Sequence, residues 1–244
     1  MKDYERETYR LHAKQRGFLA KVERAKARVN EWIRRSKKPY VAFSGGKDST
    51  VCLSLARGII EDVPAVLYHE QWLLPETEAY IRTIPSLRII ASPHTHPGGV
   101  KHWANSKPSD PSFIWIEKES RHPVEDWAES NGYDGVAVGI RCAEAGYRRR
   151  HIIAKGALFQ RVNGVHQCYP IAGWSDVDVW AYLVSTGTHY NPAYDRMSSL
   201  DIPLRERRVG PWWNDRAASY GSMDRLRMGW PEVYNKFMRE AYKR

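Results

Sequence analysis

The sequence predicts an α/β fold with a mostly parallel central sheet, helices on both faces, an N-terminal helix and a C-terminal helical extension. From residue 39, short apolar runs bounded by Pro, Gly, Asp or Ser alternate with stretches of helical spacing, which is the pattern of buried parallel strands and their covering helices. Size and composition agree. A chain of 244 residues, 42% hydrophobic and 27% charged, suits one substantial α/β domain with appendages, or two small domains.

The first expected element is an amphipathic helix between Leu11 and Ile33. Its apolar residues recur every three or four positions, as one face of a helix requires: Phe18, Val22, Ala25, Val29 and Trp32. Its other face carries four cations: Lys21, Arg24, Lys26 and Arg28. Two interpretations stay open: a helix packed on the core with a solvated basic back, or a surface for nucleic acid or a second subunit.

The following elements alternate between strand and helix. The expected strands are Tyr40–Phe43, Ala65–Tyr68, Leu87–Ala91 and Gly135–Ile140. The expected helices are Ser49–Ile60, Glu76–Ile84 and Pro123–Asn131. Residues 92–112, rich in Ser, Pro, His and Gly, form a loop long enough for a lid or a binding segment.

Charge divides the chain into three segments. Residues 1–38 hold 13 Lys and Arg against 5 Asp and Glu, residues 39–200 hold 15 against 17, and residues 201–244 hold 10 against 6. We therefore expect a basic amphipathic helical segment (1–38), a central domain (39–200) and a basic aromatic extension (201–244). Both basic ends are candidate surfaces for nucleic acid. The aromatic residues of the extension either stack on nucleobases or pack on the core: Trp212, Trp213 and Trp230.

Several classes of protein are excluded by composition. No apolar run approaches the roughly 18 residues of a membrane span, and the N-terminal residues lack the apolar region of a signal peptide. We therefore expect a cytoplasmic protein without a membrane partner. The three cysteines, Cys52, Cys142 and Cys168, are widely spaced and form no CxxC pair. One chain can therefore build neither a disulfide framework nor a four-cysteine metal or iron–sulfur site.

A glycine-rich turn follows the first expected strand. The sequence SGGKDST (44–50) lies between that strand and a helix, so its backbone N–H groups and the helix N-terminus converge on one place, which suits a phosphate. Lys47 adds a cation, and Asp48 either caps the helix or holds Mg2+. Hydroxyl groups come from Ser44, Ser49 and Thr50.

The run SGGKDS does not fit the Walker A pattern GxxxxGK[ST]. It resembles the PP-loop of the ATP pyrophosphatase superfamily, whose members cut ATP between its α- and β-phosphates or bind sulfated adenine nucleotides. The resemblance implies a Rossmann-like fold of the adenine nucleotide alpha hydrolase type, with residues 39–200 as a PP-loop nucleotide-binding domain. It also implies that the nucleotide phosphates are bound by Ser44, Gly45, Gly46, Lys47, Asp48 and Ser49.

Three more motifs follow in order: LPET (Leu74–Thr77), VGIRCAEAGYRRR (Val138–Arg150), and YPIAGWSDVDVWAYL (Tyr169–Leu183) with YNPAYD (Tyr190–Asp195) after it. Together with the PP-loop they resemble the phosphoadenosine phosphosulfate (PAPS) reductase branch of the superfamily, over roughly residues 40–196. In that branch a GxRxxE segment is followed by arginines. Carried over, it places Arg141, Glu144, Arg148 and Arg149 at the nucleotide.

Each motif also has a structural explanation. The arginines are either nucleotide ligands, since Arg forks suit phosphate and sulfate, or a solvated basic turn. Glu144 either orients Arg141 or holds a metal. Ser175 and Asp178 have the spacing of a capping box, with Asp in place of the usual Glu or Gln. The neighbouring apolar residues, Trp174, Trp180 and Leu183, are expected in the core.

The chain departs from the branch at its thiol. PAPS reductases carry a catalytic cysteine near the C-terminus in a Cys-Gly-Ile-His-like motif, whereas the last cysteine here is Cys168. Cys142, inside the arginine motif, is either a substitute thiol or a buried free cysteine. His69 stands where the family often has an Asp, so the resemblance leaves open whether this position contacts a metal or the ribose.

The resemblance and these departures lead to one functional expectation. An adenine nucleotide, ATP or PAPS, binds with Mg2+ and without an iron–sulfur cluster. ATP is cleaved to AMP and pyrophosphate to adenylylate an acceptor in nucleic-acid or sulfur modification. Lys47, Asp48 and Arg141 are the expected catalytic residues. Two alternatives are a PAPS or adenylylsulfate reductase with a non-standard thiol, and a nucleotide-dependent accessory protein that binds nucleic acid. A homo-oligomer stays open.

Overall fold

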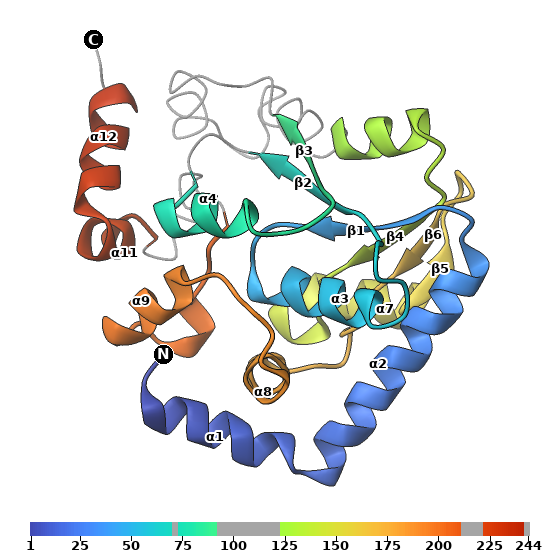
Figure 1. Ribbon diagram of the computed structural model, residues 1–244, viewed down its shortest axis with the longest axis horizontal. Coiled ribbons are helices and arrows are strands. Elements are labelled where there is room, and N and C mark those ends of the chain that lie inside the picture. The colour runs from blue at the N-terminus through green and yellow to red at the C-terminus, as the bar shows by residue number, and fades with distance from the viewer. Residues whose placement is uncertain (70–72, 92–122, 211–221, 242–244) are drawn as a thin grey trace.

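The computed structural model describes residues 1–69, 73–91, 123–210 and 222–241. Its centre is a six-stranded sheet in the order β3-β2-β1-β4-β6-β5 (Figure 1). Every pairing is parallel except that of β5 with β6. The strands are β1 (Pro39–Phe43), β2 (Ala65–His69), β3 (Leu87–Ala91), β4 (Gly135–Val138), β5 (Leu158–Gln160) and β6 (His166–Cys168). The predicted α/β, Rossmann-like class is confirmed.

Helices flank the sheet and extend beyond it at both ends of the chain. The N-terminal half holds α1 (Asp3–Ala13), α2 (Arg16–Arg35), α3 (Lys47–Arg57) and α4 (Pro75–Ile81). A further helical stretch covers residues 123–130. The C-terminal half holds η1 (Cys142–Glu144), α7 (Gly146–Lys155), α8 (Asp176–Thr186), α9 (Ala193–Ser199), η2 (Leu204–Glu206), α11 (Ser222–Gly229) and α12 (Pro231–Ala241).

Successive residues of a strand point to opposite faces of the sheet. Apolar residues of helices cover both faces. On one face Val41 packs in the main core together with Val51 of α3 and Trp32 of α2. On the other face Tyr40 packs with Ala128 of the 123–130 stretch. Figure 1 shows α2 and α3 crossing one face of the sheet.

β1 occupies the position that matters for binding. It pairs with β2 on one side, through Val41 and Ala65, and with β4 on the other, through Val41 and Ala137. The chain thus leaves β1 in one direction and later returns to its opposite edge. The carboxyl ends of β1 and β4 form a topological switch point, where open α/β sheets bind ligands.

The expected N-terminal helix is divided into α1 and α2 near Lys14 and Gln15. The apolar stripe lies on α2 and packs inward, with Phe18, Ala25, Val29 and Trp32 buried. Two of the four cations on the other face of α2 bond to other parts of the protein. Lys21 Nζ lies 2.6 Å from Oδ2 of Asp178, and Arg28 Nη1 donates to the carbonyl of Pro170 at 2.6 Å. Arg24 and Lys26 are exposed, as expected.

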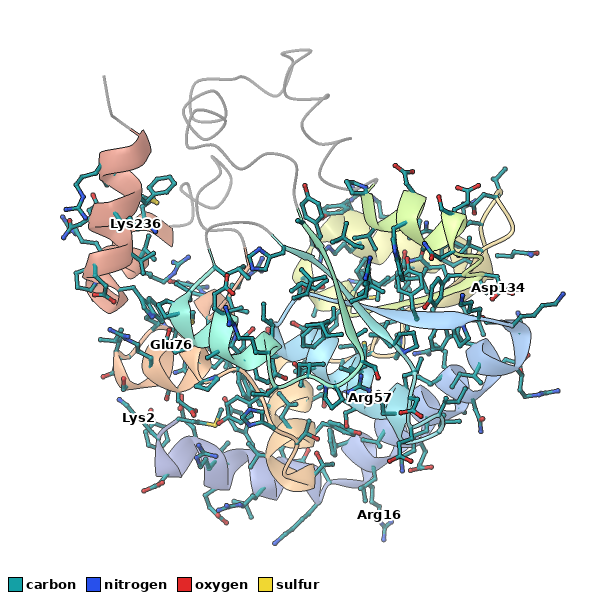
Figure 2. The ribbon with its side chains drawn as sticks, turned by 45° about the horizontal axis from the view of Figure 1, so that its top comes forward. Lys2, Arg16, Arg57, Glu76, Asp134 and Lys236 are labelled. Carbon is teal, nitrogen blue, oxygen red and sulfur yellow. The ribbon has the colours of Figure 1, made fainter. Side chains whose placement is uncertain are left out.

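The C-terminal helices pack beside α4, far from α2 (Figure 1). Glu76 of α4, labelled in Figure 2, accepts hydrogen bonds from Trp230 Nε1 at 2.7 Å and from Arg196 Nη1 at 3.0 Å. Trp230 is buried, so the core-packing alternative holds for this residue. Trp212, Trp213 and the expected loop at 92–112 lie outside the described residues.

Two other expectations differ from the structure. β3 was expected to be buried, but it is the edge strand and residues such as Ile89 are exposed. β5 and β6 were not expected, because each has only three residues. Among the described residues, no helix has the length and apolar character needed to cross a bilayer.

Candidate functional site

The glycine turn (Ser44–Gly46) joins β1 to α3 at the switch point. Gly45 has a φ of +71°, which disfavours other residues, and a Cβ there would lie 3.1 Å from Cγ2 of Thr77. Gly139, just after β4, lies still closer: a Cβ on it would be 2.8 Å from the carbonyl carbon of Asp48. Glycine at 45 therefore permits the turn beside α4, and glycine at 139 permits the segment after β4 to approach the start of α3.

The hydroxyl groups of this region are engaged in shaping the turn. Ser49 Oγ accepts from the backbone N–H of Ser44 at 3.2 Å and donates to the carbonyl of Gly46 at 2.9 Å. Thr50 Oγ1 donates to the same carbonyl at 3.0 Å. Ser44, Ser49 and Thr50 thus fix the loop, which leaves its charged residues to define the chemistry.

Four charged residues meet at the turn and form what we call the ion cluster: Lys47, Asp48, Arg141 and Asp176. Lys47 Nζ lies 2.7 Å from Asp48 Oδ2 and 3.1 Å from Asp176 Oδ1. Arg141 donates from Nε to Asp48 Oδ1 at 2.6 Å and from Nη2 to Asp176 Oδ1 at 2.8 Å. The structure therefore brings together all three predicted catalytic residues and adds Asp176.

The two cations of the ion cluster are deeply buried, with Lys47 5% and Arg141 2% exposed. Burial opposes the charge on Lys47, but the carboxylates of Asp48 and Asp176 outweigh burial, with the net result that the pKa of Lys47 is raised. Burial likewise opposes the charge on Asp176, yet Lys47 and Arg141 hold the pKa of Asp176 below its usual range. Lys47, Arg141 and Asp176 are therefore charged near neutral pH.

Asp176 is the first residue of α8, and its place is fixed by the helix cap. Ser175 Oγ accepts from the backbone N–H of Asp178, and Asp178 Oδ2 accepts from the backbone N–H of Ser175 at 2.7 Å. The predicted capping box is confirmed. Asp178 also binds Lys21 of α2 and, at 2.9 Å, His12. The N-terminal helices thus hold the start of α8 in position.

Glu144 connects Arg141 to the next arginine of the motif. Its Oε2 accepts from the backbone N–H of Arg141 at 2.9 Å and from Arg148 Nη1 at 2.6 Å. These contacts fit the expectation that Glu144 orients the arginine segment. Arg149 is exposed on α7 and makes no ion pair within the described parts of the chain.

Sequence reasoning missed three buried residues that pack against the glycine turn: Thr77, Asn191 and Tyr194. Tyr194 Oη accepts from the backbone N–H of Lys47 at 3.0 Å. Asn191 Nδ2 donates to the carbonyl of Gly45 at 3.1 Å and to Oγ1 of Thr77 at 2.8 Å. All three lie in motifs that were recognised in the sequence, LPET and YNPAYD. Their roles depend on contacts across more than a hundred residues.

The residues present do not fit a magnesium ion held by Asp48. Oδ1 of Asp48 accepts from Arg141, and Oδ2 pairs with Lys47, so both carboxylate oxygens already have cationic partners. In the described residues, no three His, Cys, Asp or Glu side chains gather as metal ligands. Asp48 is therefore better described as the anion that holds the two cations together.

The cysteines differ in accessibility. Cys52 and Cys168 are buried, and burial raises the pKa of Cys168 to about 12 and that of Cys52 well above its ordinary value. Cys142, next to Arg141, is half-buried. At the end of β2, His69 Nε2 lies 2.8 Å from Oε1 of Glu78.

The part of the chain that holds this site matches a known protein family. The model of the phosphoadenosine phosphosulfate reductase domain matches residues 38–219. The chain belongs to the PAPS reductase family. The match covers both β1 and β4 with their following segments, so the site described above lies within the family domain.

Relatives of the family domain were found by sequence and by structure. An uncharacterized protein of Methanocaldococcus jannaschii is 26% identical over 227 residues, which are 86% of this chain and 42% of that protein. A PAPS reductase of Xanthomonas campestris is 22% identical over 163 residues, 64% of this chain and 66% of that enzyme. The chain thus spans less than two thirds of the length of both relatives.

Among solved structures, the crystal structure of PAPS reductase from Candida auris in a phosphate complex resembles this chain with a TM-score of 0.56. Its identity is 17%, and the match covers 77% of this chain and 88% of that chain. This likeness concerns the fold. The family domain supports a nucleotide-binding, PP-loop-type enzyme.

Proposed function

We propose that this chain is a PP-loop enzyme that cleaves ATP to AMP and pyrophosphate and adenylylates an acceptor. The observation that carries the proposal is the ion cluster. Lys47 and Arg141 are buried cations that meet beside a glycine turn and the N-terminus of α3. Backbone N–H groups and two cations at one place suit a polyphosphate whose negative charge grows as the reaction proceeds.

In the proposed reaction a nucleophilic atom of the acceptor attacks the α-phosphorus of ATP. The bond between the α-phosphorus and the bridging oxygen breaks, and that oxygen leaves with the bonding electron pair as part of pyrophosphate. The AMP group is transferred to the acceptor, whose proton passes to solvent, and free AMP forms when water or a second nucleophile displaces it from the acceptor. Lys47 and Arg141 neutralise the leaving group. Because both cations are paired with Asp176, phosphate oxygens compete with this carboxylate for the same donors.

The state of the thiols favours ATP cleavage over reduction of PAPS. A reductase needs a thiolate, since the thiolate is the nucleophilic form of cysteine. Cys52 and Cys168 are buried and their raised pKa values keep them protonated. Among the cysteines of this sequence, Cys142 is the remaining candidate, and the alternative of a reductase rests on it.

The test compares two site variants with a matched lysine variant. Lys47→Ala and Asp48→Ala remove one cation and its partner, while Lys26→Ala removes a 53% exposed cation of α2. Calorimetric titrations with ATP and with PAPS measure affinity, and AMP, pyrophosphate and sulfite are quantified after incubation. Melting curves establish that each variant is folded.

We expect wild type and Lys26→Ala to bind ATP and to release pyrophosphate. Lys47→Ala should lose about ten- to a hundredfold in affinity, since a charge-assisted hydrogen bond contributes about 1.5–3 kcal/mol. Unchanged affinity in both site variants would overturn the assignment of the turn. Sulfite from PAPS without pyrophosphate from ATP would favour the reductase.

A further inference from the structure

The helix that carries the arginines of the motif, α7, is largely exposed to solvent. Of its ten residues, Ile152 alone is buried, where it packs with Tyr169 and Ala172. Ile153 is 71% exposed and Tyr147 is 48% exposed. A helix of a globular protein normally covers an apolar stripe, so most of the α7 surface is available to a partner.

This surface is also strongly basic. The sequence of α7, GYRRRHIIAK, contains four Lys and Arg and no Asp or Glu. Arg148 is partly neutralised by Glu144. The other three, Arg149, Arg150 and Lys155, are exposed and form no ion pair with an acidic residue of the described segments. By contrast, exposed cations of α2 such as Lys26 and Arg34 pair with neighbouring glutamates.

The basic surface is coupled to the candidate site by a single carboxylate. Oε2 of Glu144 accepts from the backbone N–H of Arg141, at the ion cluster, and from Arg148 on the first turn of α7. A partner lying along α7 is therefore next to the segment that positions Arg141. This arrangement suits a substrate that is larger than the nucleotide.

We propose that α7 binds the phosphate backbone of a single-stranded nucleic acid and presents it as the acceptor to the nucleotide site. The choice of acceptor rests on the proposed function, whereas binding to α7 does not. Arg149 and Arg150, exposed side by side in the sequence of α7, provide counterions for a polyphosphate chain and fork-shaped donors for its oxygens. Tyr147 is exposed, and Cζ of Arg148 lies 5.8 Å from the centroid of its ring. Exposed aromatic rings are surfaces on which unpaired bases stack.

The same observations argue against other partners. An amphipathic helix that lies in a membrane needs a broad apolar face, and the exposed large apolar residues of α7 are Tyr147 and Ile153. The basic face of α2 is the other candidate for nucleic acid. Two of its four cations, Lys21 and Arg28, are bonded to Asp178 and to backbone carbonyls, which reduces its available charge.

The experiment compares two double variants of equal charge change. Arg150→Gln with Lys155→Gln neutralises α7 outside the predicted nucleotide contacts, and Arg24→Gln with Arg34→Gln neutralises α2. The probe is a labelled single-stranded RNA of mixed sequence, measured by fluorescence anisotropy over a series of salt concentrations. Parallel arms use the same sequence as single-stranded DNA, its duplex, and vesicles that contain phosphatidylserine. Calorimetry with ATP is run on each protein.

We expect wild type and the α2 variant to bind the single strands alike. The α7 variant should bind on the order of tenfold more weakly at low salt, and its slope of log K against log salt should fall by roughly 0.7 per lost contact. Its ATP affinity should stay the same. If wild type does not bind ATP, the proposed function fails, and the anisotropy measurement still tests whether α7 binds nucleic acid.

Three results would overturn the inference. The first is that wild type binds no single strand even at low salt. The second is that the α2 variant loses as much affinity as the α7 variant, which would place the nucleic acid on the N-terminal segment. The third is that vesicles alone are bound, which would make α7 a membrane contact.

Discussion

Arg141 donates from Nη2 to Oδ1 of Asp176 at 2.8 Å, which joins the segment after β4 to the first residue of α8. The same oxygen of Asp176 lies 3.1 Å from Lys47 Nζ. One carboxylate oxygen therefore holds both buried cations of the ion cluster. If the proposed function holds, a phosphate oxygen competes with Asp176 for these two cations.

Replacing Asp176 by Asn should destabilise the protein and make it more responsive to anions. The change removes one of two carboxylates from a pair of buried cations, and we expect a loss of about 1–3 kcal/mol in the free energy of unfolding. For a protein of this size, each kcal/mol lowers the melting temperature by roughly 2–4 °C. Inorganic pyrophosphate should raise the melting temperature of Asp176→Asn more than that of wild type, because the anion replaces the missing charge.

A matched control for this variant is Asp224→Asn on α11, since the Asp224 side chain is 77% exposed and lies 3.9 Å from Arg227. Such exposed pairs contribute little to stability, so its melting temperature should stay near that of wild type with and without pyrophosphate. Equal pyrophosphate shifts in Asp176→Asn and wild type would contradict the idea that this carboxylate and a phosphate compete.

The sequence predicted the parts of the site that depend on local chemistry. The glycine turn, the start of α3 and the capping box of α8 each have a signature within six residues, because backbone conformation and caps are short-range effects. Asp176 was missed for the same reason. The capping pair around it explained the local pattern, whereas its partners Lys47 and Arg141 are far away in the sequence.

The fold was predictable where apolar runs were long enough to signal burial. β1, β2 and β4 match the expected strands within a few residues. β6, in contrast, contains His166 and Gln167 and is a strand because it pairs with β4, Gly135 facing His166. Such pairing is a tertiary effect that overrides local propensity. At the division of α1 from α2, residues 14 and 15 are Lys and Gln, and Gly17 lies in the first turn of α2.

Gly139→Ala should disturb the glycine turn from the opposite strand. The added Cβ would lie 2.8 Å from the carbonyl carbon of Asp48 and 2.9 Å from the N of Ser49, and backbone atoms cannot easily yield. We expect a loss of about 1–3 kcal/mol in stability and a weakened affinity for ATP. Gly173→Ala is the control, because a Cβ there meets no atom within 4 Å. Similar melting curves and titrations for the two variants would disprove the close approach.

Asp178 should make the protein sensitive to acid. Burial opposes its charge, but hydrogen bonds from Lys21, His12 and Ser175 lower the pKa of Asp178 to about 2. An unfolded Asp titrates near 3.9, so as pH falls the unfolded chain takes up the proton first. The stability that Asp178 contributes is therefore complete above about pH 4 and is lost as pH falls towards 2.

Asp178→Asn should remove this dependence. Urea midpoints are measured for both proteins from neutral pH down to pH 3. At neutral pH the midpoint of Asp178→Asn should be lower than that of wild type. Below pH 4 it should decline less steeply than that of wild type. Asp62→Asn, at an exposed position after α3, should keep the wild-type profile. An unchanged acid slope in Asp178→Asn would mean that other carboxyl groups carry the acid response.

The three cysteines should react in a fixed order with iodoacetamide. Cys142 is half-buried, whereas Cys52 and Cys168 are buried and their pKa values are raised. Because the thiolate is the reactive form, mass spectrometry should find Cys142 modified first and the other two modified only after unfolding in urea. If the proposed function holds, Cys142→Ser should release pyrophosphate from ATP at the wild-type rate. Sulfite production from PAPS by wild type that disappears in Cys142→Ser would instead establish this cysteine as the nucleophile of a reductase.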